Sequence, residues 1–346
     1  MRNNSQIIPS LDGLRAVSIG LVIFAHSMNG EFVGNLGVRI FFVISGYLIT
    51  FLLLKEFNST GSVNLKRFYF RRTMRIFAPF YFFLAMVGLA SFLGFISLSS
   101  RALITPFTYT SNYLLADSWY TGHSWSLAVE EQFYLIFPPL LLALRKKKVI
   151  ATLVFILLLA PVLRVIGYHL FPESVDVVVI YGFHANMDAL ASGCLLAFAA
   201  EYERSRRFLI KISKLPQTAV IVAAALIFVA NLQGDHPHLF FGACVTFMNV
   251  GTALIIYWTI INSQNSFIGR VLNTKALSFI GVLSYSLYLW QQVFTGKEMH
   301  GYFPFNLLLV FACALISYYT VERYSLKLRT YLEQRSIRKQ LSVVTS

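Results

Sequence analysis

The stretch LGVRIFFVISGYLITFLLL, residues 36–54, is an apolar run that contains a single charged residue, Arg39. A membrane-spanning helix needs about 20 mostly apolar residues, so this stretch predicts one. Nine further stretches of the chain have a similar length and character. The ten predicted spans are residues 13–30, 36–54, 76–97, 124–143, 149–167, 182–200, 217–233, 239–261, 276–295 and 303–320.

The composition of the whole chain agrees with this pattern. Of 346 residues, 57% are hydrophobic and 13% are charged, about half the charged share of a soluble protein. A soluble domain of this length cannot bury so much apolar surface. The composition therefore excludes a soluble enzyme, a disordered chain and a secreted disulfide scaffold. It predicts an all-α polytopic membrane protein, with a transmembrane domain over residues 1–320 and a basic tail over 321–346.

The charge balance predicts an orientation. The chain has 29 Lys and Arg against 15 Asp and Glu, a net charge of +14. In the ten-span arrangement, 24 of the 29 cations fall on one side and three on the other. Cytoplasmic loops carry an excess of cations, so we expect both termini in the cytoplasm. Topology thus explains the charge without nucleic-acid binding. The tail is either an amphipathic helix on anionic lipid or a solvated basic segment.

The first span carries two costly ionisable residues, Arg15 and His26. They are 11 residues apart, which places both on one helical face, about 16 Å apart along the axis. Ionisable residues inside a span are candidate functional residues, and neutral His can act as a general base near pH 7. The alternative is a buried His that hydrogen-bonds to a neighbouring helix.

Three arginines lie close together in KRFYFRRTMRIFAP, residues 66–79. Arg71, Arg72 and Arg75 fall within little more than one helical turn, so we expect their guanidinium groups to converge. Guanidinium groups match phosphate geometry, which makes these residues candidates for phosphate binding. The alternative is ordinary positive-inside charge.

Polar residues also interrupt two later spans. In SWSLAVEEQFYLIFP, residues 124–138, Ser126, Glu130 and Tyr134 share one helical face, and Glu131 points about 100° away. The carboxylates either orient a catalytic His, act as acid or base, or cap the helix. In the span 182–200, Asp188 follows His184 by one turn and is a candidate hydrogen-bond partner for it. A structural contact between helices explains this pair equally well, and the lone Arg164 is interpreted as interfacial.

The chain resembles the membrane-bound acyltransferase 3 family. The resemblance rests on IPSLDGLRAVSIGLVIFAH at residues 8–26, where Arg15 is followed by His26. Five further motifs follow in the family's order: LGVRIFFVISGYLIT, FYFRRTMRIFAPFY, SWSLAVEEQFYLIFP, MDALASGCLLA and GVLSYSLYLWQQ. They extend to residue 292, and VER at 321–323 also fits.

This resemblance implies transfer of an acyl group, usually acetyl, from a coenzyme A thioester. It implies that His26 is catalytic, that Arg15, Arg72 and Arg75 serve the donor, and that Glu130 matches the family's glutamate. The expected donor-binding set is Arg15, Arg71, Arg72 and Arg75, with Glu131, Tyr134 and Asp188 as further candidates for substrate binding. The chain departs from the family where members often have Arg, at Asn186, and where many have His, at Gln291. The extracytoplasmic hydrolase-like domain of some members is expected to be absent.

The expected function is O-acylation of a glycan such as O-antigen, capsule or exopolysaccharide, in the inner membrane of a bacterium. Acyl-CoA is the expected donor and no metal is expected. Two mechanisms remain open: His26 deprotonates the acceptor hydroxyl, with Glu130 orienting it, or His26 is itself acylated. Other acceptors are a small molecule or a lipid-linked sugar. A proton-coupled transporter is the alternative from another class.

Overall fold

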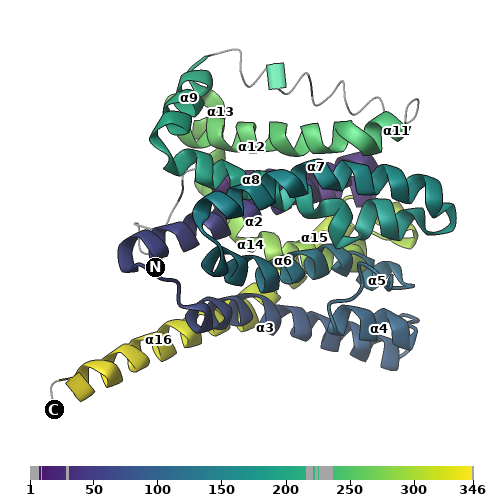
Figure 1. The fold of residues 1–346 in the computed structure, drawn as a ribbon. Helices are drawn as coiled ribbons and strands as arrows, with labels where there is room; N and C mark the ends of the chain where they lie inside the picture. The colour runs from purple at the N-terminus through teal and green to yellow at the C-terminus, as the bar shows by residue number, and fades with distance from the viewer. Residues whose placement is uncertain are drawn as a thin grey trace.

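The computed structural model describes residues 8, 10–28, 31–215, 221, 222, 225 and 237–344. Within these residues the chain is built from helices and contains no strand. The all-α prediction is therefore confirmed for the described part of the chain (Figure 1). The predicted span 217–233 lies almost wholly outside the described residues.

Six of the described helical segments are long and apolar enough to cross a membrane. Each overlaps one of the predicted spans. They are α1 (Leu11–Met28), α2 (Glu31–Thr60), α3 (Leu65–Phe92), α7 (Lys146–Leu170), the segment Pro237–Ile261 that ends in α12 (Val245–Ile261), and the segment that begins at α15 (Phe305–Ser317) and continues into α16 (Arg323–Val344). The structure thus supports a multi-pass membrane protein, although the six helices do not confirm the predicted number of ten.

Three more of the predicted spans coincide with helices of 19 or 20 residues. They are α6 (Ser124–Ala143), α8 (Phe183–Glu201) and α14 (Lys275–Phe294). These helices fall outside the group of six because they carry more polar residues, such as Glu130, Asp188 and Gln291. Those same polar residues form the buried contacts described below.

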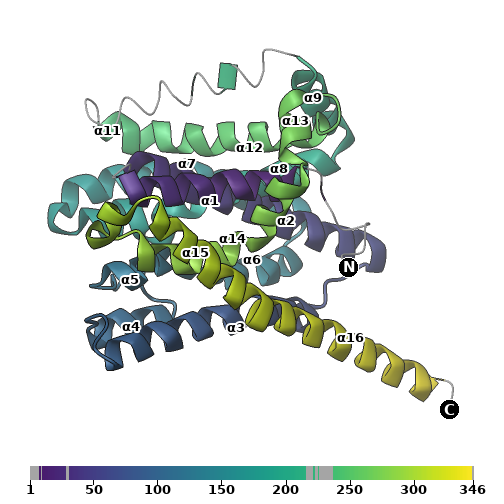
Figure 2. The ribbon, with the colours of Figure 1, turned by 180° about the vertical axis from the view of Figure 1, so that it is seen from behind.

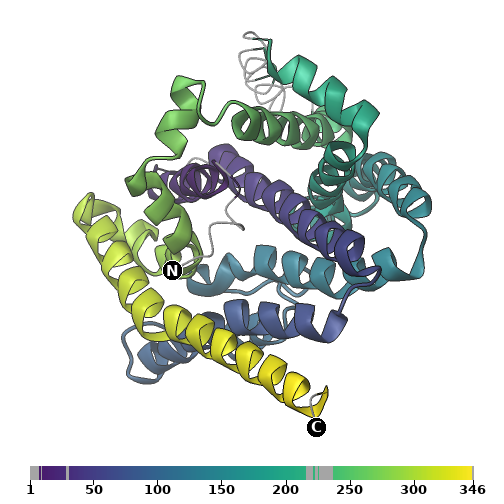
Figure 3. The same cartoon turned by 90° about the vertical axis from the view of Figure 1, so that its left-hand side faces the viewer.

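The long helices form one bundle (Figures 1 and 2). Helix α1 packs against α2 and α14, and α2 packs in turn against α8, which contacts α7. Seen end-on, α1 and α2 lie in the middle of the bundle, whereas α16 crosses its outside next to α3 (Figure 3). Shorter helices α4 (Ser100–Phe107), α5 (Trp119–Gly122), α9 (Glu203–Ser213) and α13 (Phe267–Leu272) lie in the connections.

Two glycines allow α2 and α8 to touch backbone to backbone. A Cβ at Gly46 would lie 2.1 Å from the carbonyl oxygen of Leu190, and one at Gly193 would lie 2.1 Å from that of Val43. Small residues permit such close approach between membrane helices. The α2 and α8 backbones therefore touch at two points, and only glycine is accommodated at either position.

Several cation-rich connections meet at one end of the bundle. Lys146 at the start of α7 donates to Glu201 at the end of α8 at 2.6 Å and to Asn58 near the end of α2 at 2.9 Å. Asn273, between α13 and α14, accepts from the backbone N–H of Ser10 at 2.8 Å. Arg15 also lies toward this end of α1, whereas His26 lies toward the opposite end.

Candidate functional site

His26 is held near the far end of α1 by residues of two other segments. Its Nδ1 lies 2.6 Å from Oε1 of Gln291 on α14. The indole ring of Trp119 on α5 meets the imidazole ring edge-on, with centroids 5.1 Å apart. The indole N–H of Trp119 donates to the carbonyl oxygen of Gln292 at 2.8 Å, which ties α5 to the same turn of α14.

The buried His123 makes the same kind of contact with Gln292, the residue of α14 that follows Gln291. Its Nδ1 lies 2.7 Å from Oε1 of Gln292, which also accepts from the His123 backbone N–H. The His123 side chain is 2% exposed, and its Nε2 has no hydrogen-bond partner within the described parts of the chain. Sequence analysis did not single out His123, although it directly precedes the SWSLAVEEQFYLIFP motif.

A narrow cavity of about 80 Å³ lies between α1, α2, α3, α6 and α14. Its polar lining consists of Arg15, Ser45, Arg72, Ser126, Glu130, Tyr134, Ser284, Tyr285 and Tyr288. We call it the arginine cavity. The predicted shared face of Ser126, Glu130 and Tyr134 is confirmed, because all three line it. Glu131 is not among the lining residues, so Glu130 is the carboxylate that faces the cavity.

Charges of both signs converge at the arginine cavity. The Arg72 guanidinium lies 4.9 Å from the ring centroid of Tyr134, whose hydroxyl is 2.6 Å from that of Ser45. The Glu130 carboxylate lies beside these two hydroxyls and within electrostatic reach of Arg15 and Arg72. Arg75 lies within reach of both arginines as well. The structure thus brings Arg15, Arg72, Arg75, Glu130 and Tyr134 together.

Arg71 turns away from this group. Its Nε and Nη2 atoms donate to the two carboxylate oxygens of Glu333 on α16, at 2.5 and 3.1 Å. Ser325 on α16 also donates to the Met74 carbonyl oxygen. The Arg71 side chain is thus paired with a carboxylate 262 residues along the chain, and its expected part in donor binding stays a prediction.

Hydrogen bonds connect the arginine cavity toward the His26 end of the bundle. The Ser126 and Tyr288 hydroxyls are 2.5 Å apart, and both contact the carbonyl oxygen of His123 at 3.1 Å. His123 in turn contacts Gln292, the neighbour of Gln291. Arg15 lies about 16 Å from His26 along α1, and the described neighbours of Glu130 are Arg15, Arg72, Ser45 and Tyr134.

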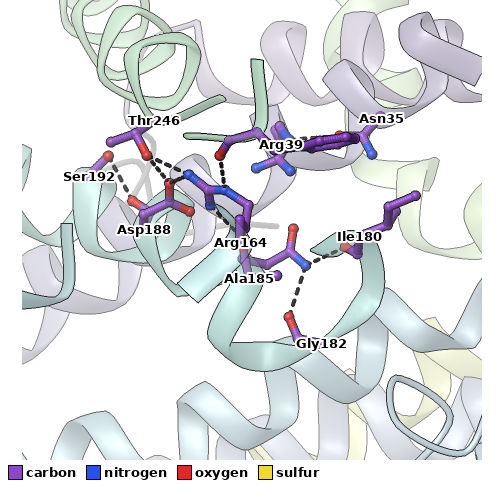
Figure 4. Close-up of polar contacts among 11 residues, drawn as sticks. Asn35, Arg39, Arg164, Ile180, Gly182, Ala185, Asp188, Ser192 and Thr246 are labelled. Atoms are coloured by element: carbon purple, nitrogen blue, oxygen red, sulfur yellow. Dashed lines mark hydrogen bonds and ion pairs between the residues drawn. The ribbon is translucent and has the colours of Figure 1, made fainter. Parts of the chain in front are cut away.

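A separate cluster of buried charge joins α7, α8 and η4 (Phe240–Cys244) (Figure 4). Arg164 donates to the carboxylate of Asp188 at 3.0 Å, to the Thr246 hydroxyl at 2.6 Å, and to the carbonyl oxygens of Phe241 and Ala185, each at 2.7 Å. Arg164 and Asp188 are both 0% exposed. We call Arg164, Asp188 and Thr246 the buried ion-pair cluster. The interfacial interpretation of Arg164 is wrong, because its guanidinium is bonded inside the helix bundle.

The neighbours of this cluster have partners of their own. His184 contacts the Val178 carbonyl oxygen at 2.8 Å and the Tyr113 hydroxyl at 3.4 Å, so the expected His184–Asp188 hydrogen bond is absent from these described residues. Asn186 donates to the carbonyl oxygens of Ile180 and Gly182. The buried Arg39 donates to Asn35 at 2.7 Å (Figure 4).

In the described part of the chain, no group of three or more His, Cys, Asp or Glu side chains could hold a metal ion. The three cysteines are free, with Cys194 and Cys244 buried and Cys313 partly exposed. The polar chemistry of the site thus consists of imidazole, guanidinium, carboxylate, amide and hydroxyl groups.

Comparison with known proteins gives one consistent result. A family model described as an acyltransferase domain matches residues 8–321. The chain is similar to peptidoglycan O-acetyltransferase OatA of Listeria monocytogenes, with 31% identity over 318 residues, covering 84% of this chain and 49% of that protein. It is also similar to O-acetyltransferase OatA of Staphylococcus aureus, with 31% identity over 354 residues, covering 91% and 56%. The chain spans about half the length of these relatives, and no solved structure matches it.

Proposed function

The chain belongs to the acyltransferase family, and on that premise we propose that it transfers an acetyl group from cytoplasmic acetyl-CoA to a glycan hydroxyl. The observation that carries this proposal is the division of α1 between two polar environments. Arg15 lines the arginine cavity at one end, and His26 contacts Gln291 and Trp119 near the other. One helix thus links an anion-binding end to a candidate base.

The arginine cavity fits the donor. Arg15 and Arg72 line it and Arg75 lies beside them, so guanidinium groups are available for the phosphates of coenzyme A. Hydroxyl groups of Ser45, Ser126 and Tyr288 line the rest of the cavity and offer hydrogen bonds to the amide groups of the pantetheine arm. The axial rise of about 16 Å between Arg15 and His26 is comparable to that arm when extended. A donor bound through its phosphates would therefore present its thioester near His26.

His26 is the proposed base of the transfer. It takes the proton of the acceptor hydroxyl as the hydroxyl oxygen attacks the thioester carbonyl carbon. The carbon–sulfur bond then breaks, and the proton passes to the departing coenzyme A sulfur. If His26 is acylated first, its nitrogen attacks the carbonyl carbon, the carbon–sulfur bond breaks and coenzyme A leaves as the thiolate. The acceptor hydroxyl oxygen then attacks the same carbon, the nitrogen–carbon bond breaks, and the hydroxyl proton passes to the freed imidazole. Incubation with labelled donor and no acceptor separates these routes, because only the second leaves label on the protein.

Glu130 is the proposed positioning residue of the donor site. Its carboxylate lies beside the Ser45 and Tyr134 hydroxyls and near Arg15 and Arg72. In this position it partly balances two guanidinium groups and restrains them when the donor is absent. The expected orientation of His26 by Glu130 stays a prediction beside this role.

A glycan is the proposed acceptor because one relative is named a peptidoglycan O-acetyltransferase. We place the cation-rich end of the bundle in the cytoplasm, in the inner membrane of a bacterium. Cysteine labelling tests this orientation. An impermeant maleimide applied to intact cells should label Ser100→Cys at the far end, and should label Lys147→Cys only after the cells are broken open.

The decisive experiment measures transfer by purified protein in lipid nanodiscs. Radiolabelled acetyl-CoA and soluble peptidoglycan fragments should yield base-labile label on the glycan and free thiol from the donor. His26→Ala should abolish both the glycan label and the release of free thiol. Its membrane insertion and its elution profile in size-exclusion chromatography should match those of wild type. Near-normal transfer by His26→Ala would refute the assignment of the base. Mass spectrometry of surface glycans with and without the gene identifies the natural acceptor.

A further inference from the structure

Gln291 occupies the contact point of the candidate base. Its side chain is 0% exposed, and its Oε1 lies 2.6 Å from Nδ1 of His26. The Thr295 hydroxyl approaches the same oxygen at 3.3 Å. The amide nitrogen of Gln291 has no hydrogen-bond partner among the described residues. The Thr295 hydroxyl makes its shorter hydrogen bond, 2.9 Å, with the backbone carbonyl oxygen of Gln291, so the closest contact of the amide oxygen is with His26.

We propose that Gln291 is a positioning residue that fixes the tautomer of His26. An amide oxygen can only accept a hydrogen bond, so Nδ1 must carry the proton at this contact. A neutral imidazole has one N–H, so Nε2 is then unprotonated and carries the lone pair that accepts the proton of the acceptor hydroxyl. This inference rests on the proposed function of His26 as the base.

The packing of α14 against α1 keeps this contact in place. A Cβ at Gly281 of α14 would lie 1.8 Å from the carbonyl oxygen of Asp12 on α1, so the two backbones touch. From this point of contact, α14 runs on to Gln291 as α1 runs on to His26. The distance between the amide oxygen and Nδ1 therefore depends on two helices that cannot shift independently.

The neighbouring residue provides a natural control. Gln292 is also buried, but its side-chain oxygen contacts His123. The described groups around His26 include the indole of Trp119 and the Gln291 amide, and the titratable His123 lies within electrostatic reach. Arg15 is the charged group on the same face of α1, about 16 Å away.

Three variants in nanodiscs test the proposal, each compared with wild type across pH. Gln291→Leu removes the acceptor at similar size, and we expect kcat to fall on the order of 10²-fold with an unchanged KM for acetyl-CoA. Gln291→Glu keeps an acceptor and adds a negative charge that favours protonated His26. Its kcat/KM should therefore begin to fall about one pH unit higher than in wild type, or more. Gln292→Glu adds the same charge beside His123, and the pH at which its kcat/KM falls on the acid side should lie closer to that of wild type.

A spectroscopic measurement reads the tautomer without activity. Solid-state NMR of protein with 15N-labelled histidine, assigned by comparison with His26→Asn, should show protonated Nδ1 and unprotonated Nε2 in wild type. The reverse pattern would overturn the proposal, even if Gln291→Leu fails to fold. The proposal would also be overturned if kcat of Gln291→Leu equals that of wild type. The same holds if Gln291→Glu does not change the pH at which kcat/KM falls on the acid side.

These outcomes are separable from failure of the proposed function. If wild-type protein transfers no acyl group, or if His26→Ala transfers it normally, the function itself is wrong. If wild type is active, His26→Ala is inactive and Gln291→Leu is fully active, only the role of Gln291 is wrong.

Discussion

The arginine cavity and the buried ion-pair cluster both place charged side chains within apolar helices, but they differ in what surrounds those charges. Arg164 donates to four protein oxygens and is fully buried with Asp188. Arg15, Arg72 and Glu130 instead border a cavity. A guanidinium whose hydrogen bonds are made inside the protein has little capacity for a ligand. The difference separates a structural use of charge from the donor-binding use that we propose for the arginine cavity.

The largest expected effect lies in the buried ion-pair cluster. Asp188→Ala leaves the Arg164 charge buried without its partner, so we expect a loss of about 3–5 kcal/mol in the free energy of unfolding. Unfolding in SDS, or survival of the eluted peak after heating in detergent, measures this loss. As a control, the double variant Arg164→Leu with Asp188→Leu removes both charges and should recover part of the stability. Normal stability of Asp188→Ala would show that the pair is not structural.

The next effect concerns donor affinity at the arginine cavity. Arg72→Ala removes a guanidinium available to a phosphate, and we expect KM for acetyl-CoA to rise about tenfold to a hundredfold. Stability should change far less than for Asp188→Ala, and excess donor should restore much of the rate. Arg72→Lys keeps the charge without the planar group over Tyr134, so its KM should lie between the two. A loss of rate that excess donor cannot restore would argue against donor binding.

Glu130→Gln distinguishes two roles for one carboxylate. If Glu130 positions Arg15 and Arg72, we expect KM for the donor to rise by a smaller factor, on the order of threefold to tenfold, while kcat is retained. Steady-state kinetics with acetyl-CoA as the varied substrate provide the measurement. A fall in kcat at constant KM would instead support the orientation of His26 by Glu130. Glu131→Gln, which alters the adjacent carboxylate outside the cavity lining, is the matched control.

The smallest effect is expected at Arg71. Its pair with Glu333 is partly exposed, with 37% and 19% of the two side chains accessible, and such pairs contribute about 0–1 kcal/mol. Arg71→Ala should therefore leave KM for acetyl-CoA unchanged and lower stability by less than about 1 kcal/mol. Glu333→Gln should match it in both assays. A rise in KM for Arg71→Ala alone would show that Arg71 contributes to donor binding, as the sequence predicts.

Sequence patterns predicted those features that depend on local spacing. The helices follow the apolar runs, and Ser126, Glu130 and Tyr134 line one cavity because residues four apart share a helical face. His26 and Arg15 are predicted to be functional residues because ionisable residues are costly inside a span. In each case, a few neighbouring residues contained enough information.

Features that depend on distant partners were missed. Arg164 lies in an apolar helix, and nothing near it in the sequence indicates that Asp188 and Thr246 will surround it. Arg71 resembles its neighbours until α16 brings Glu333 to it. Gln291 is recognised in the sequence only as a departure from the family's histidine, and Gln292 carries no signal because it is neutral. Their contacts with the imidazoles of His26 and His123 appear only in the structure.

The close fit at Gly46 and Gly193 has a consequence for genetic screens. Gly46 directly follows Ser45, which borders the arginine cavity, and any larger residue would push α2 away from α8. Selection for loss of acyl transfer should therefore recover changes at these two glycines as readily as changes at His26 or Arg72. Two glycines, which have no functional group, would thus be recovered together with the proposed base and the proposed donor-binding arginine. Only the lower protein yield of the glycine variants would distinguish them from variants of His26 or Arg72.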